Sequence, residues 1–211
     1  DINRDNIQQI FGSTNEGFDE IWWFYPSASS NTNDRYVVYN YVQQIWYYGT
    51  LSRTAWLDSG IRDFPLAATN SNNLVQHEVG LDDAETGTTA AITASITSAQ
   101  FDLDDGHKFM LVSRMIPDVT FDGSTADSPV VSMSLSALQN SGSGFNDPLS
   151  ESGNSGGSVT RTATSPVEEF TEQIFLRVRG RQVSFKVEST AQGVTWQLGS
   201  PRIDMRPDGR R

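Results

Sequence analysis

The strongest signal of catalytic chemistry in this sequence is a serine in a glycine-rich segment. Ser155 lies in the pentapeptide Gly153-Asn-Ser-Gly-Gly157, and His77 and Asp102 precede it along the chain. These three residue types act together when the histidine takes the proton of the serine and the aspartate orients the histidine. Such a nucleophile works only if its base and its orienting group are held within hydrogen-bond reach.

The pentapeptide and the chain order are similar to those of chymotrypsin-fold proteases, but two features of the sequence argue against that chemistry. The histidine of that family follows small residues at a corner between a strand and a turn, whereas His77 lies inside the apolar alternation of Leu74–Val79. Ser155 lies in a Ser- and Gly-rich stretch, where such a pentapeptide arises from composition and where rigidity is low. We therefore expect no catalytic residues and no enzyme activity, which labelling with a serine-directed phosphonate would check.

The motifs for metals and cofactors are incomplete. Asp102-Leu-Asp-Asp-Gly106 offers oxygen ligands, but a calcium loop of the EF-hand type needs a bidentate Glu about six residues after the glycine, and the residues around Ser113 supply none. A tight turn between strands explains this segment better. His77 and His107 lack a partner cluster, cysteine is absent, and neither a phosphate-binding loop nor a dinucleotide-binding fingerprint occurs. We expect no metal and no cofactor.

Charge is distributed unevenly along the 211 residues, whose formal net charge is −11. Residues 1–160 contain 6 Lys/Arg and 20 Asp/Glu, whereas residues 161–211 contain 9 Lys/Arg and 6 Asp/Glu. The acidic part should repel a phosphate backbone, so nucleic-acid binding is not expected for most of the surface. The basic part is either a solvated face or a patch that faces a partner or DNA.

Neither a membrane span nor a secretory signal is expected. No run approaches the roughly 20 apolar residues that a membrane-spanning helix needs, and no positively charged and apolar leader follows Asp1. Because the first residue is not Met, we expect the start to be either a processed end or a cut through a longer protein.

Aromatic residues are concentrated near the N-terminus and predict β-strands. The runs 18–25, 35–41 and 45–48 are rich in aromatic and β-branched residues, and turn-forming residues separate them. All six tyrosines and four of the five tryptophans lie within residues 22–56. Such strands suit a sheet that is buried on both faces, and together with residues 54–58 they are typical of one β-propeller blade leading into the next. The expected structural aromatic core consists of Trp22, Trp23, Tyr36, Tyr39, Trp46 and Trp56.

The sequence on either side of this aromatic stretch predicts further elements. Residues 1–12 predict a short helix that Asn3 caps and Gly12 ends. Residues 64–79 predict a hairpin around the turn Asn70–Asn73. Two blade-like units are too few to close a propeller ring, which typically needs four or more blades, so we expect either further blades upstream or another element against which these strands pack.

The composition changes near residue 84, and a second domain is expected over residues 85–211. Its short strands with Gly-rich spacers are typical of a β-sandwich. The expected strands are residues 92–101, 108–117, 130–138, 158–164, 172–178, 182–188 and 194–198. Alternation on both sides of Gly180-Arg181 predicts a half-buried hairpin, and the Ser-, Gly- and Asn-rich residues 139–158 predict a long, mobile surface loop. The predicted fold class is all-β, with a partial β-propeller in residues 1–84 and a β-sandwich-like region after it.

Several strings in the sequence resemble a single protein family. They are Phe18–Ala28, Asn33–Tyr41, Ile45–Asp58, His77–Gly80, Phe101–Gly106, Arg114–Asp118, Gly180–Gln182 and Gly199–Gly209. Together they are similar to the C-terminal region of the tail hub, or nozzle, proteins of short-tailed bacteriophages, which are also called DNA-stabilisation proteins. The likeness spans nearly the whole chain; the aromatic strings match specifically and the sandwich part more loosely.

The resemblance implies a virion protein of the phage tail: a hexameric ring that contains a β-propeller, lies below the portal and adaptor, and holds and then conducts the genome. The implied partners are further copies of the chain, the tail adaptor, and tail fibre, spike or needle proteins, while DNA passes without sequence-specific binding. Arg177, Arg179 and Arg181 are candidates for a subunit or adaptor contact, because arginine pairs well with carboxylates at interfaces. The alternative is a carbohydrate- or receptor-binding β-protein, in which Trp and Tyr rings would stack on sugars.

Overall fold

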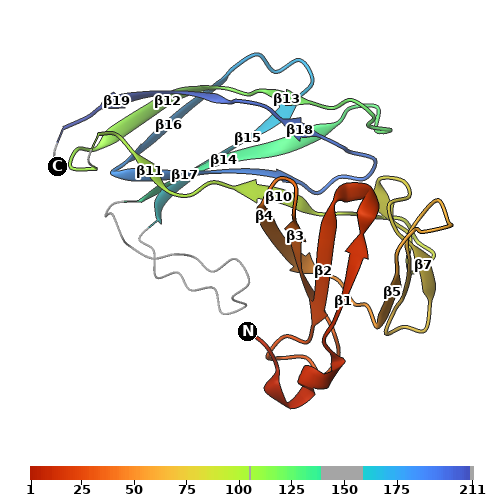
Figure 1. Ribbon diagram of the computed structural model, residues 1–211. Coiled ribbons are helices and arrows are strands. Elements are labelled where there is room, and N and C mark those ends of the chain that lie inside the picture. The colour runs from red at the N-terminus through yellow and green to blue at the C-terminus, as the bar shows by residue number, and fades with distance from the viewer. Residues whose placement is uncertain (105, 139–158, 210–211) are drawn as a thin grey trace. The chain divides into compact units, whose positions relative to one another are not determined.

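The computed structural model describes residues 1–104, 106–138 and 159–209, and the chain divides into two compact units, Asp1–Gly80 and Leu81–Arg211 (Figure 1). Both units are built from antiparallel sheets, which confirms the all-β class. The boundary follows Gly80 and not residue 84, because Asp82–Asp83 already pairs with Ala90–Ala91 of the second unit.

A four-stranded antiparallel sheet in the order β1-β2-β3-β4 dominates the first unit. Its strands are β1 (Phe11–Asn15), β2 (Glu20–Tyr25), β3 (Arg35–Asn40) and β4 (Ile45–Thr50). A short 3-10 helix, η2 (Glu16–Phe18), joins β1 to β2. Aromatic and β-branched residues fill β2, β3 and β4, which form where the sequence predicts them. Each strand pairs with the next along the chain, so the sheet is a meander.

The N-terminal helix is shorter than predicted. Asn3 caps a 3-10 helix, η1 (Arg4–Gln9), and its side chain accepts a hydrogen bond from the Asp5 backbone N–H at 3.0 Å. Gly12 does not end this helix but lies within β1. A Cβ at that position would lie 3.2 Å from the Trp23 indole, so the absence of a side chain lets β1 lie close to this ring.

A three-stranded sheet in the order β5-β6-β7 completes the first unit. Its strands are β5 (Ala55–Leu57), β6 (Leu66–Ala68) and β7 (Leu74–Gln76). β6 and β7 form the predicted hairpin, with Leu66 opposite Gln76. Among the residues that the structure describes, these sheets do not close a ring of blades, so the propeller stays a prediction.

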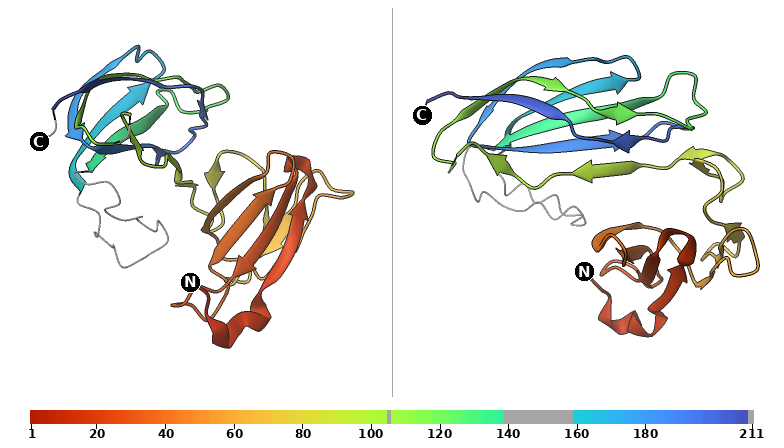
Figure 2. Two further views of the ribbon diagram at one scale, coloured as in Figure 1. Left: turned by 60° about the vertical axis from the view of Figure 1, so that its left-hand side comes forward. Right: turned by 45° about the horizontal axis from the view of Figure 1, so that its top comes forward.

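Two sheets of the second unit enclose its apolar core, and Figure 2 shows them as two layers of strands. One sheet has the order β10-β17-β14-β15, with β11 also paired to β17, and the other has the order β16-β12-β19. The strands of these sheets are β10 (Ala94–Thr97), β11 (Phe101–Asp102), β12 (Met110–Ile116), β14 (Val130–Leu138), β15 (Val159–Glu168), β16 (Ile174–Gly180), β17 (Gln182–Ser189) and β19 (Arg202–Pro207). Two short pairs flank them: β8 (Asp82–Asp83) with β9 (Ala90–Ala91), and β13 (Val119–Thr120) with β18 (Gln197–Leu198).

Alternate residues of the long strands fill this core. Both layers contribute side chains that are almost completely buried: Met110, Val112, Met115 and Val178 from one sheet, and Met133, Leu135, Val183 and Val187 from the other. The period-two alternation predicted for residues 182–188 therefore does mark the buried face of β17.

The predicted hairpin across Gly180-Arg181 is wrong. β16 pairs with β12, whereas β17 pairs with β14 and β10, so the two strands belong to opposite sheets. Gly180 lies where the chain crosses between the sheets: a Cβ there would lie 2.8 Å from the Leu138 carbonyl oxygen and 3.0 Å from the Ala137 Cβ. The Arg181 backbone N–H donates to the same Leu138 oxygen at 2.8 Å. The alternation showed which face of each strand is buried, but it does not encode the partner strand.

The structure also contains a strand that the sequence does not predict. β19 lies beside β12, and Pro201 and Pro207 flank its alternating residues, which obscures the strand pattern. The predicted mobile loop at residues 139–158 lies outside the described residues.

Candidate functional site

One face of the β1–β4 sheet forms the apolar core of the first unit. Trp22, Phe24 and Val38 are buried there, and Tyr36 and Trp56 pack against them. The Trp22 ring centroid lies 4.8 Å from that of Tyr36 and 5.3 Å from that of Trp56. Ring pairs of this kind contribute about 0.5–1.5 kcal/mol beyond their area burial. Three of the six expected core aromatics therefore lie in this cluster.

The other three expected core aromatics lie on the opposite face, which we call the outer aromatic face and define by Trp23, Tyr39, Trp46 and Tyr48. The strand register places all four on one side of the sheet. The Trp46 ring centroid lies 4.6 Å from that of Tyr39 and 5.8 Å from that of Trp23. Trp46 is nevertheless 62% exposed and Tyr48 44% exposed. The expectation of burial is wrong for Trp46, because β4 is an edge strand with a neighbour on one side only.

A buried carboxylate lies in the core of the first unit. Glu20 accepts hydrogen bonds from Trp22 Nε1 at 2.8 Å, from Asn15 Nδ2 at 3.4 Å and from the Tyr47 hydroxyl. Burial, followed by the hydrogen bond to Glu20 and its charge, raises the pKa of Tyr47, so this hydroxyl remains a donor. Burial and then the charge of Glu20 also raise the pKa of Tyr36. Since several donors satisfy the carboxylate, Glu20 acts as an anchor of the core.

A second carboxylate, Glu78, reaches the same cluster from the segment after β7. Its backbone φ is 60°, in the left-handed region that residues other than glycine rarely adopt. Asn15 Nδ2 donates to Glu78 Oε1 at 3.2 Å, and desolvation followed by the charge of Glu20 raises the pKa of Glu78. Two neighbouring carboxylates with different environments are a feature of acid–base sites. Here Glu20 is buried among its hydrogen-bond donors. The Glu20–Glu78 pair is therefore better explained as a structural part of the core than as an acid–base site.

The residues that could form a catalytic triad have structural partners of their own. His77 belongs to the first unit, where Arg53 Nε donates to His77 Nε2 at 2.8 Å. Asp102 belongs to the second unit, where Gln182 Nε2 donates to Asp102 Oδ2 at 3.1 Å. Each therefore takes part in a hydrogen bond within its own unit, and Ser155 is not among the described residues.

The acidic segment after β11 forms a turn. The Gly106 backbone N–H donates to the Leu103 carbonyl at 3.2 Å, and Asp104 Oδ2 lies 3.6 Å from Lys108 Nζ. Within the described parts of the chain, no three His, Asp or Glu side chains converge as metal ligands would. Neither of the two short helices found there has the length and apolar character needed to cross a membrane.

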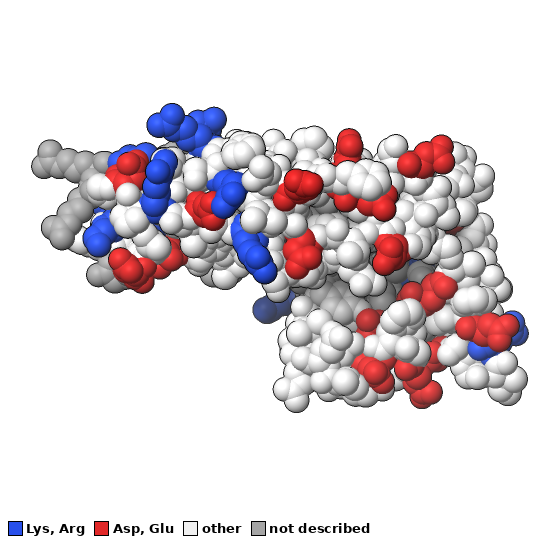
Figure 3. Space-filling view, turned by 90° about the horizontal axis from the view of Figure 1, so that it is seen from above, with Lys and Arg blue, Asp and Glu red and all other residues white. Residues whose placement is uncertain are grey.

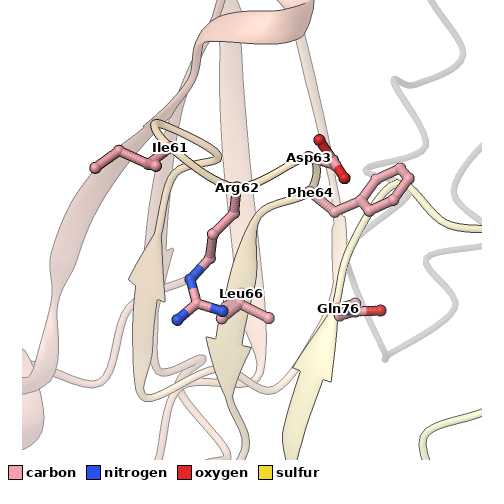
Figure 4. Close-up of a pocket in the computed structure, with 6 residues that line it drawn as sticks. All are labelled: Ile61, Arg62, Asp63, Phe64, Leu66 and Gln76. Carbon is pink, nitrogen blue, oxygen red and sulfur yellow. The ribbon is translucent and has the colours of Figure 1, made fainter.

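A pocket of about 260 Å³ lies on the first unit beside β6 and β7 (Figure 4). Its lining residues are Ile61, Arg62, Asp63, Phe64, Leu66 and Gln76. The Arg62 side chain extends along β6, whereas Asp63 and Phe64 project on the other side of the loop and Ile61 points away. The pocket is open, and its polar groups do not converge on one point, so it offers no defined ligand site.

The three arginines predicted for a contact occupy different environments in the second unit. Arg177 and Arg179 are exposed on the outward side of β16. Arg179 Nε lies 2.5 Å from Asp208 Oδ2, and its guanidinium lies 4.3 Å from the centroid of the Phe109 ring. Arg181 is half-buried at the crossing between the sheets, 5.1 Å from the same ring centroid. Arg177 forms no ion pair with another described residue.

Three arginines that sequence reasoning did not single out lie on the same outward side. Arg114 is on β12, and Arg202 and Arg206 are on β19. The register places Leu111 of β12 between Arg179 of β16 and Arg206 of β19. The alternating charges of β19 were the signal for an outward face, but only its pairing with β12 brings these arginines together.

No protein-family model matches the chain, and no curated protein matches it either. The outer aromatic face of the first unit and the arginines of the second unit are therefore the features from which function is inferred.

Proposed function

We propose that this protein is a structural component of a bacteriophage tail, a hub or nozzle ring that helps to retain the packaged genome and forms the conduit for its ejection. The observation that carries the proposal is the β1–β4 sheet, an antiparallel four-stranded meander with aromatic residues on both faces. Propeller blades are sheets of this form, arranged radially around a channel. The strings that resemble tail hub proteins run through these strands.

The two faces of the sheet support assembly in different ways. On the inner face, β5 of the following sheet supplies Trp56, whose Nε1 donates to the Thr14 carbonyl at 2.9 Å. On the outer aromatic face, Trp46 and Tyr48 remain exposed side by side. Contiguous exposed apolar patches, unlike single exposed side chains, mark interaction surfaces. A neighbouring blade on this face would remove apolar area from water, at about 25 cal/mol per Å².

The charge of the chain suits a DNA conduit. A channel wall that bound phosphates would slow the passage of the genome, because each Lys or Arg contact to a phosphate adds affinity. The net charge of −11 favours repulsion over binding. This property supports a structural role in which DNA passes without being held by sequence-specific contacts.

Electron microscopy of the purified full-length gene product, together with mass spectrometry of purified virions, tests the proposal. We expect a ring with a central channel and the presence of the protein in virions. The Trp46→Ala/Tyr48→Ala variant should weaken the ring, whereas the control Phe170→Ala, at a side chain that is 88% exposed in the second unit, should leave it intact. A monodisperse monomer that is absent from virions would contradict the proposal.

A second candidate function is the binding of a glycan or a receptor, and the exposed Trp46 ring is the observation that favours it. Tryptophan presents a large apolar face with a polar N–H group, which suits a sugar ring. Against it, the Trp23 ring stacks against Trp46 and the Tyr39 ring lies tilted beside it, so both compete with a sugar for contact with Trp46. Glycan-array binding that is lost in Trp46→Ala and kept in Phe170→Ala would support this candidate, and an array without binding would exclude it for the glycans tested.

A further inference from the structure

Charge in the second unit is separated into a basic face and an acidic end. We define the basic face by the arginines on the outward side of the β16-β12-β19 sheet: Arg114, Arg177, Arg179, Arg202 and Arg206. Figure 3 shows Lys and Arg gathered over the part of this unit near the C-terminus, with some Asp and Glu among them, whereas its other part shows Asp and Glu without Lys or Arg. Since both lie on one compact unit, the separation does not depend on how the two units are placed.

The basic face has more positive charge than its own carboxylates neutralise. Arg114 Nη2 lies 2.7 Å from Asp204 Oδ2, and Arg179 pairs with Asp208 in the same way. The other three arginines, Arg177, Arg202 and Arg206, are exposed and form no ion pair with any residue that the structure describes. Arg202 and Arg206 are four residues apart on β19, or about 14 Å at 3.4 Å per residue. Three unneutralised guanidinium groups are thus spread over one sheet face.

Apolar side chains lie among these arginines. Phe175 is opposite Arg114 in the register and is 74% exposed, and Leu111 lies between Arg179 and Arg206. Arginine and aromatic residues are enriched at protein–protein interfaces relative to the rest of the surface. An exposed phenylalanine contributes little to contact with a phosphate backbone, which depends on positive charge. The composition of the face therefore favours a protein partner with an acidic surface.

The acidic end is formed by segments that meet at the turn around Gly193. The Gly193 backbone N–H donates to Asp82 Oδ1 at 2.9 Å, and its carbonyl accepts from the Thr125 N–H at 2.8 Å. These contacts bring the β8 segment, with Asp83, together with the loop that carries Asp122 and Asp127. No Lys or Arg occurs in residues 81–107 or 115–138, so nothing in these segments offsets the acidic charge.

We propose that the basic face docks on the acidic end of a second copy of this chain. The two patches are complementary to each other and neither is self-complementary, so the contact is head-to-tail, with one free basic face and one free acidic end left on each pair. Repetition of such a contact closes a ring when the rotation per subunit allows it. This inference rests on the proposed function, because it names the interface by which a ring would form.

Charge complementarity within one sequence favours a second copy over nucleic acid. The chain has a net charge of −11, and two of the five arginines are already paired with aspartates. A second copy offers Asp83, Asp122 and Asp127 in two segments, residues 81–107 and 115–138, that contain no Lys or Arg. Electrostatic pairing of this type steers association and selects the partner, and it weakens as salt is added.

Charge-swap variants of the full-length gene product test the proposal. The basic-face variant is Arg177→Glu/Arg206→Glu, the acidic-end variant is Asp122→Arg/Asp127→Arg, and a third variant combines all four substitutions. The matched control is Arg4→Glu/Arg161→Glu, which makes the same charge change at two exposed arginines outside both patches. Self-association is measured by sedimentation velocity at 50 and 500 mM NaCl, together with binding of a labelled 30-base-pair DNA duplex.

Each two-site variant should associate at least tenfold more weakly than the wild type, and the control should associate normally. Association should return in the four-site variant, and also when the two two-site variants are mixed, because each mixed contact again joins opposite charges. If the wild type forms rings and the basic-face variant associates as strongly as the wild type, the proposed interface is wrong but the ring proposal stands. A wild-type chain that stays monomeric would overturn both, and loss of DNA binding alone in the basic-face variant would assign the face to nucleic acid.

Discussion

Replacement of Gly180 by alanine should strongly destabilise the second unit. Gly180 occupies the crossing between the two sheets, where a Cβ would lie 2.8 Å from the Leu138 carbonyl oxygen, 3.0 Å from the Ala137 Cβ and 3.0 Å from the Gln182 carbonyl oxygen. Two of these neighbours are backbone atoms in or beside paired strands, so they cannot rotate away as a flexible side chain would.

The cost can be estimated from these contacts. Inserting a methyl group into a well-packed site typically destabilises by about 1–3 kcal/mol. Because relief at Gly180 requires movement of β14 and β17 together, we expect a value near the upper limit, about 3 kcal/mol. With a urea dependence of about 2 kcal/mol per M, the unfolding midpoint of the second unit should fall by roughly 1.5 M.

Hydrogen exchange measured by mass spectrometry across a urea series is the appropriate assay, because it reports on each unit separately. Peptides from β14 and β17 report on the second unit, and those from β2 and β3 on the first. Gly17→Ala is the matched control, since a Cβ at Gly17 would have no heavy atom within 4 Å. A shift of less than about 0.3 M in the unfolding midpoint of the second unit, or about 0.6 kcal/mol, would refute this reasoning. The close approach of the two sheets would then not be the reason for a glycine at position 180.

Three further predictions concern the first unit. Trp22→Ala should lower the unfolding free energy by about 3–5 kcal/mol, because it leaves a cavity in the core. Trp46→Ala, at a side chain that is 62% exposed, should lower it by less than about 1 kcal/mol in the isolated chain. Equal losses for the two variants in urea unfolding would contradict the assignment of one buried and one exposed face. Glu20→Gln should cost roughly 1–3 kcal/mol by thermal unfolding, because it replaces an acceptor with an N–H donor that faces the donors of its neighbours. Glu78 has a raised pKa in the folded state, so the folded chain binds more protons than the unfolded one and stability falls as the pH rises above 4.5. The melting temperature of Glu78→Gln should therefore show a smaller fall between pH 4.5 and 7 than that of the wild type, and parallel curves would refute this assignment.

The strands of the first unit were predictable because their signals are local. Aromatic and β-branched residues favour extended backbone wherever they occur, and turn-forming residues bound each run. β1 was less visible, since Gly12, Ser13 and Asn15 resemble turn chemistry and form a strand only because β2 pairs with them. The exposure of Trp46 was also not predictable, because a side chain on an edge strand is covered or exposed according to what lies beside the sheet.

In the second unit, alternation of apolar residues determined which side of each strand is buried, as Val183, Phe185 and Val187 show. The sequence by itself thus determined the all-β class, most strand positions and the inward faces, because propensity and period-two alternation act within a few residues. Only the tertiary structure decided that β16 and β17 lie in opposite sheets and that arginines from β12, β16 and β19 share one face. Strand pairing joins residues far apart in the sequence, and it depends on how the whole core is buried, which no local pattern records.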